Sequence, residues 1–155
     1  MRGLRISRTC WIGLAVLLVL SLGSARAIDL DSNNVTYKLP NQITWTGDPN
    51  VAETAILQGD PMKEGSLYIE LVKWHPHHMS RPHFHPNARY ITVLSGTWWV
   101  GTGTKYDPDQ TVPMPAGSYV VDLPKGIHYD GAKDEDAVIE IVGIGPATMT
   151  PAEAK

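Results

Sequence analysis

Apolar and polar residues alternate along several short stretches of the chain, which is the period of a half-buried β-strand. Many positions in these stretches carry β-branched or aromatic residues, as in SLYIELVKW, and Ser95-Gly96 joins two of them as a hairpin turn does. The predicted strands are residues 54–58, 66–74, 88–94, 97–100, 118–123 and 137–142. The stretch 137–142 is almost continuously apolar, which is typical of a strand buried on both faces. With no convincing helical period, the pattern predicts an all-β, jelly-roll-like barrel.

The first 27 residues follow a different pattern. Three arginines precede an uncharged apolar run over residues 10–20, and the stretch ends in Ala-Arg-Ala at Ala27. The apolar run is shorter than the roughly 20 residues that a membrane helix needs. We therefore expect residues 1–27 to be a signal peptide that is cleaved after Ala27. The mature protein would be periplasmic or secreted, with no stable membrane span after processing.

The rest of the chain predicts a single domain in three parts. Residues 28–50 are polar and rich in turns, and we expect them to be a lead-in that packs on the barrel. Residues 51–145 contain the predicted strands and form the barrel itself. Residues 146–155 are expected to be a C-terminal tail.

Composition narrows the classes of function. The 155 residues suit about one domain, and the net charge of −3 becomes more negative once the arginines of the predicted leader are removed. Because no basic surface is visible, binding of nucleic acid is not expected. The single cysteine, Cys10, lies in the leader, which excludes an internal disulfide and a cysteine-rich zinc site in the mature chain.

Histidines carry the most specific chemical signal. Five of the six lie between positions 75 and 85, and two of these, His83 and His85, are separated by one residue. On a strand, residues two apart share a face, so both imidazoles can reach one metal ion. Pro82 and Pro86 restrict the backbone on either side of the pair.

Two longer motifs resemble those of the cupin family. His83-Phe84-His85, then residue 89 and later Gly96, resemble the first cupin motif, and the second is matched by Gly117, Pro124, Gly126 and His128, with one extra residue between its glycine and its proline. The resemblance covers roughly residues 66–142 and is strongest to small exported proteins with one cupin domain. It implies a double-stranded β-helix in which His83, His85 and His128 bind a divalent metal ion: Zn, Cu, Fe, Mn or Ni.

Arg89 departs from the cupin pattern. The family usually has glutamate there, sometimes glutamine, as a fourth ligand, whereas arginine stays protonated and cannot ligate a metal. In one interpretation the metal is held by three histidines alone. In the other the metal is lost, and Arg89 and the histidines bind an anion. If strand alternation continues from His83, Arg89 points into the barrel and needs an anionic partner, either Asp130, Glu70 or the carboxylate of a ligand.

Several other polar residues are open to two interpretations. Asp130, Glu70 and Asp122 are candidates to replace the missing carboxylate, although acidic residues as a class prefer the solvated surface. His75, His77 and His78 surround Pro76, and exposed turn residues are the simpler interpretation. A second metal site or a pH-sensitive patch near the barrel mouth is the alternative.

Three classes of function fit these residues. The first is a metal-dependent enzyme, an oxygenase, isomerase or lyase acting on a small molecule, with Arg89, Tyr90 and Tyr129 as candidate catalytic residues. The second is a non-catalytic, metal-free barrel that binds or senses a small anion through Arg89 and the histidines. The third is a structural subunit whose interior is filled by side chains. Because a small barrel has a limited core, a homodimer is also expected.

Overall fold

The computed structural model describes residues 30–155, and the predicted signal peptide therefore lies outside the described residues. Residues 30–36 form a short segment of their own, in which the Asp31 carboxylate accepts hydrogen bonds from Asn33 and Asn34. Residues 37–155 form the second unit and contain all the described strands. No helix within residues 30–155 is long and apolar enough to cross a membrane.

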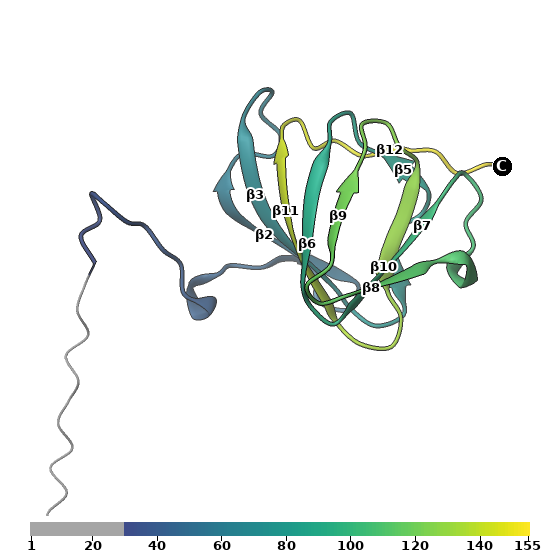
Figure 1. Ribbon diagram of the computed structural model, residues 1–155, viewed down its shortest axis with the longest axis horizontal. Coiled ribbons are helices and arrows are strands. Elements are labelled where there is room, and N and C mark those ends of the chain that lie inside the picture. Colours follow the sequence, from purple (N-terminus) through teal and green to yellow (C-terminus); the bar gives the residue numbers. More distant parts are fainter. Residues whose placement is uncertain (1–29) are drawn as a thin grey trace, which may run out of the picture. The chain divides into compact units, whose positions relative to one another are not determined.

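The strands of residues 37–155 form two antiparallel sheets, each with neighbours far apart in sequence (Figure 1). In spatial order, the first sheet contains β1 (Thr46–Asp48), β2 (Ala52–Gly59), β3 (Leu67–Trp74), β11 (Ala137–Ile144), β6 (Arg89–Ser95) and β9 (Tyr119–Asp122). The second contains β12 (Thr150–Pro151), β5 (His83–Phe84), β10 (His128–Ala132), β7 (Thr97–Thr102) and β8 (Val112–Pro115), and β4 (His78–Met79) also pairs with β10. The described helical segments are two 3-10 turns, Pro40–Gln42 and Pro108–Gln110. The predicted all-β class is confirmed.

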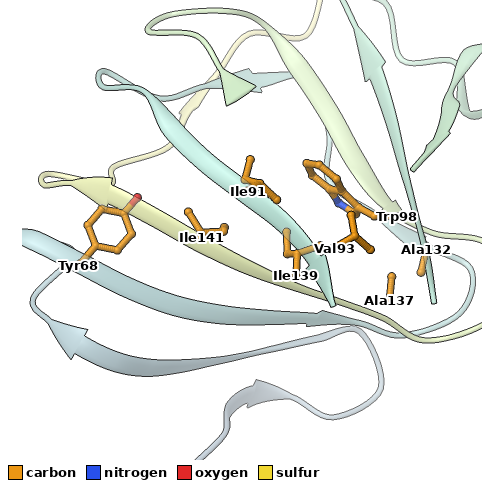
Figure 2. Packing of buried hydrophobic residues seen from close by; sticks show 8 residues of the cluster. All are labelled: Tyr68, Ile91, Val93, Trp98, Ala132, Ala137, Ile139 and Ile141. Carbon is orange, nitrogen blue, oxygen red and sulfur yellow. The ribbon is translucent and has the colours of Figure 1, made fainter. Parts of the chain in front are cut away.

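The core lies between the two sheets, where Figure 2 shows side chains of both gathered together. Directly paired residues on neighbouring strands share a face, and Ile141 on β11 pairs with Ile91 on β6. Both are buried, as is Trp98 on β7 of the opposite sheet. Every second residue of β6, from Arg89 through Ile91 to Val93, therefore faces the interior, as the sequence alternation predicts.

Both ends of the second unit pack against its strands. On the N-terminal side, β1 pairs with β2, and the indole of Trp45 lies 4.3 Å from the Lys73 ammonium. On the C-terminal side, β12 pairs with β5, and the Ala152 amide donates to the Pro82 carbonyl. The C-terminal segment thus runs beside the His83-Phe84-His85 motif. The expected homodimer stays a prediction.

His75, directly after β3, contacts two carboxylates from separate parts of the second unit. Its Nε2 lies 3.1 Å from the Glu53 carboxylate on β2, and its Nδ1 lies 3.0 Å from Asp136, just before β11. Hydrogen bonding to Asp136, and then to Glu53, raises the pKa of His75. The interpretation of His75 as an exposed turn residue is therefore wrong. Its side chain is only 18% exposed and pairs with carboxylates from elements far apart in sequence.

His75→Gln should destabilise the protein more at about pH 5.5 than at about pH 8.5. A raised folded-state pKa gives stability that is fully present below the unfolded value of about 6.5 and is lost as the pH rises through the folded value. Urea unfolding midpoints of the variant and the wild type at both pH values measure this. His78→Gln is the control, because its ring contacts the Pro76 carbonyl and no carboxylate. Equal destabilisation by His75→Gln at both pH values would contradict the prediction.

Candidate metal centre

Three histidines meet where β5 and β10 lie side by side in the second sheet. His83 pairs directly with His128 in the strand register, and His85 is the first residue after β5. The backbone carbonyl of His85 also accepts a hydrogen bond from Lys125, in the turn that leads into β10. All three imidazoles are buried, and their potential ligand nitrogens lie within 4.8 Å of one another.

Backbone carbonyls orient the three rings. The Nδ1 atoms of His83, His85 and His128 lie 2.8, 3.1 and 2.9 Å from the carbonyl oxygens of Arg81, Thr148 and Gly126, respectively. A carbonyl oxygen can only accept a hydrogen bond, so each Nδ1 carries the proton and donates it. Each Nε2 therefore keeps its lone pair, in the tautomer that a metal-binding imidazole needs.

The lone pairs of the Nε2 atoms converge. The Nε2 atoms of His83 and His85 are 3.1 Å apart, and neither ring has a second proton to place between them. Burial lowers the pKa of His83, and burial with the nearby Arg89 guanidinium lowers the pKa of His85 to about 3. Both imidazoles therefore stay neutral at ordinary pH, as metal ligation requires. This donor set fits one divalent ion, which would relieve the repulsion between the facing lone pairs.

Arg89 points into the barrel beside these rings and pairs with Asp122. The two residues are directly opposite each other on β6 and β9, and the guanidinium donates to Asp122 Oδ2 from Nε, at 3.0 Å, and from Nη2. The same Nη2 donates to His128 Nε2 at 3.2 Å. The predicted partners of Arg89, Asp130 and Glu70, were wrong, because the partner is set by strand pairing that single-strand alternation does not reveal.

The surface interpretation of two of the acidic residues is also wrong. Asp122 and Asp130 are only 7% and 5% exposed. Asp130 faces the same way as His128, as two-residue spacing on a strand requires, and its Oδ2 lies 3.8 Å from His128 Nε2. Its Oδ1 accepts a hydrogen bond from the indole of Trp98 in the core.

The third acidic candidate lies farther from the histidines. Glu70 is half-buried on β3, and burial raises the pKa of its carboxyl group. It pairs in register with Ile141, whose side chain is in the core. Glu70 therefore faces the interior, but it lines neither the histidine cluster nor the cavity described below.

These buried groups offset the positive charge of Arg89. Asp122 pairs with Arg89, and Asp130 lies beside His128, so two carboxylates share the cluster with one guanidinium. Arg89 therefore does not make the centre repel a cation.

A cavity of about 430 Å³ opens beside the histidines. His83, His85, Arg89 and Asp130 line one part of it. The other walls are mostly apolar side chains: Val51, Val72, Trp74, Met79, Pro82, Ile139, Ile141, Met149 and Pro151, with Ser80 and Arg81 as further polar residues. A volume of this size is within the range of small-molecule pockets, so side chains do not fill the interior.

The two tyrosine candidates lie away from the cavity. Tyr90 is 48% exposed, because it follows Arg89 on β6 and points to the opposite face of the sheet. Tyr129 is buried, but its hydroxyl donates to the backbone carbonyl of Asp107 at 2.9 Å. The structure brings together His83, His85, His128 and Arg89, and it adds Asp122 and Asp130 to them. The sequence named Asp122 as a candidate for the missing carboxylate, but its pairing with Arg89 follows only from the register of β6 and β9.

Comparison with known proteins supports the fold. No protein-family model matches the chain, and a search of curated proteins finds no match. Among solved structures, the polyketide cyclase RemF from Streptomyces resistomycificus is similar with a TM-score of 0.62 and 15% identity over 78% of this chain and 87% of that chain. KdgF from Halomonas sp. has a TM-score of 0.55 and 16% identity, covering 71% of this chain and 95% of its own.

A third similar structure is named as a cupin. An RmlC-like cupin from Shewanella frigidimarina has a TM-score of 0.55 and 13% identity, covering 70% of this chain and 90% of its own. The two antiparallel sheets together with these likenesses show that the chain has the cupin double-stranded β-helix. The fold predicted from the sequence is confirmed.

Arg89→Glu should tighten metal binding by about tenfold or more, which is about 1.4 kcal/mol. The substitution frees His128 Nε2 from the guanidinium and adds a carboxylate beside the three imidazoles. It should also destabilise the metal-free protein by about 3 kcal/mol, because Asp122 is left buried without its partner. Competition with a chromophoric chelator measures the affinity, and thermal unfolding with and without Zn²⁺ measures the stability. Arg89→Leu, which removes the guanidinium but adds no ligand atom, is the control, and equal affinities of the wild type and Arg89→Glu would contradict the prediction.

Proposed function

We propose that this protein is a metal-dependent enzyme that binds one divalent ion through His83, His85 and His128 and acts on a small molecule in the adjoining cavity. The observation that carries the proposal is the convergence of three buried imidazoles, two of which, His83 and His85, line an apolar cavity. Three protein ligands leave coordination positions for substrate or water, which is the arrangement of a catalytic site more than of a structural one.

The metal would act as a Lewis acid that polarises an oxygen of the substrate. The protein's own residues orient and enclose that substrate. The carbonyls of Arg81, Gly126 and Thr148 fix the imidazole rings, and the apolar walls exclude water from the reacting group. Isomerase, lyase and oxygenase reactions all fit such a centre.

The metal-free alternative, a barrel that binds an anion through Arg89 and the histidines, is disfavoured by charge. Asp122 already occupies two donors of Arg89, and Asp130 adds a second negative charge beside the imidazoles. Two carboxylates in the cluster weaken the attraction of the site for an anion unless a cation is present. The charges therefore favour a function in which metal binding comes first.

The proposal predicts one divalent ion per mature chain. Purified protein refolded with Zn²⁺, Mn²⁺, Fe²⁺, Ni²⁺ or Cu²⁺ should hold about one equivalent after gel filtration, with Cu²⁺ and Zn²⁺ bound more tightly than Mn²⁺ or Fe²⁺. His128→Ala should weaken Zn²⁺ binding by at least about 100-fold, because two imidazoles and no carboxylate ligand remain.

Elemental analysis and chelator competition measure both effects. His78→Ala is the matched control, because His78 belongs to no metal-binding cluster among residues 30–155. Less than about 0.2 equivalents of every metal after refolding would rule the proposal out.

We infer that the chain is exported before it binds metal. The support is the sequence of residues 1–27, with its arginines, its short apolar run and its Ala-Arg-Ala end. N-terminal sequencing of protein recovered outside the cytoplasm should begin at Ile28. A full-length chain that stays in the membrane or the cytoplasm would contradict export, and Ala27→Leu is the control that should block cleavage by removing the small residue.

A further inference from the structure

We propose that the cavity binds an apolar carboxylate, and that this ligand and the metal ion bind cooperatively, with Arg89 as the anchor of the carboxylate. The proposal rests on the proposed function, because it needs a metal at the three histidines. It names the class of ligand: a mainly hydrocarbon body, such as an aromatic ring system, with one carboxylate at the end that faces the metal.

The walls of the cavity determine the body of the ligand. Val72, Ile139 and Ile141 line it from adjacent strands of the first sheet, and the indole of Trp74 extends this surface to the end of β3. Met79 and Met149 add two flexible, polarisable side chains. Because so few polar groups line these walls, a sugar or another polyhydroxyl compound would leave most of its hydroxyls without hydrogen-bond partners. A hydrocarbon body has no hydrogen bonds to lose there.

The polar part of the cavity determines the functional group. Arg89 lines the cavity, and its Nε and Nη2 atoms donate to Asp122 and His128, whereas Nη1 donates to no acceptor among residues 30–155. No buried side-chain nitrogen or oxygen in that part of the chain lacks a partner, so Nη1 is open to the cavity. Two N–H donors beside a metal centre suit a carboxylate that receives a hydrogen bond at one oxygen and meets the metal with the other.

Charge links the two binding events. A divalent ion at the three histidines would add two positive charges beside Arg89, so a carboxylate would be attracted more strongly with the metal bound than without it. Arg89 Nη2 also occupies the lone pair of His128 that the metal needs, and a carboxylate gives the guanidinium a different partner. The ligand therefore favours the metal-bound arrangement. By linkage, each must tighten the binding of the other by the same factor.

The test measures the Co²⁺ dissociation constant of the mature protein by visible absorption, with and without 2-naphthoate. We expect naphthoate to tighten Co²⁺ binding by at least tenfold. Its neutral isostere 2-naphthamide and the short anion acetate, at the same concentration, should change the Co²⁺ dissociation constant by less than twofold. Titration of Co²⁺ with each probe in the absence of protein corrects for complexes formed in solution.

Four variants assign the effect to residues. Arg89→Gln should keep Co²⁺ but lose the response to naphthoate, and Val72→Thr, which keeps the shape of the wall but adds a hydroxyl, should reduce the response severalfold. Arg81→Gln tests the second guanidinium at the cavity, whose side chain is 60% exposed. Lys133→Gln, at a cationic residue outside the cavity lining, is the matched control and should respond as the wild type does.

Each result has one meaning. A wild type that binds no Co²⁺ overturns the proposed function. A wild type that binds Co²⁺ with no change on adding naphthoate overturns the present inference alone, and so does an equal response to naphthamide. Loss of the response in Arg81→Gln but not in Arg89→Gln would place the carboxylate at the exposed guanidinium and overturn the role of Arg89. If Arg89→Gln does not fold, the comparison of naphthoate with naphthamide on the wild type still decides the coupling.

Discussion

A buried positive charge requires a buried negative one, and the interior of this barrel is organised around that constraint. Arg89 occupies a position facing the core, where an unpaired guanidinium would cost several kcal/mol. Asp122 meets it across the β6–β9 pairing, and Asp130 adds a second negative charge from the opposite sheet. Arg89, Asp122 and Asp130 therefore form one set of buried polar residues around the histidines, and the place of each depends on the other two.

The same set bears on how this fold could hold a metal ion without a carboxylate ligand at position 89. The glutamate that the cupin pattern predicts there would both ligate an ion and lower the charge of the site. Here three imidazoles could ligate an ion, and two aspartates outside the histidine cluster lie beside them. An ion held by three imidazoles alone would keep one more coordination position open.

The sequence predicted those features that depend on local periodicity. Alternation along residues 88–94 placed Arg89, Ile91 and Val93 on one inner face, and spacing within the motifs selected the three histidines that the structure brings together. It could not predict features that depend on which strands become neighbours. Asp122 was one of three acidic candidates, and only the pairing of β9 with β6 places it against Arg89. The cavity walls likewise come from several segments that are far apart in sequence. The face that a residue occupies on its own strand follows from the local sequence, whereas the identity of the neighbouring strand does not.

One orienting contact gives the C-terminal segment a role in the chemistry. The ring of His85 is held by the carbonyl of Thr148, which lies just before the short strand β12. The backbone around this residue is fastened at Pro61 on one side and at Pro82 on the other. A protease that trimmed the chain behind Ile144 would remove no ligand and no cavity-forming strand of the first sheet, yet it would free an imidazole to rotate. The segment after β11 therefore contributes to the orientation of His85 through its backbone alone, although it supplies no side chain to the histidine cluster.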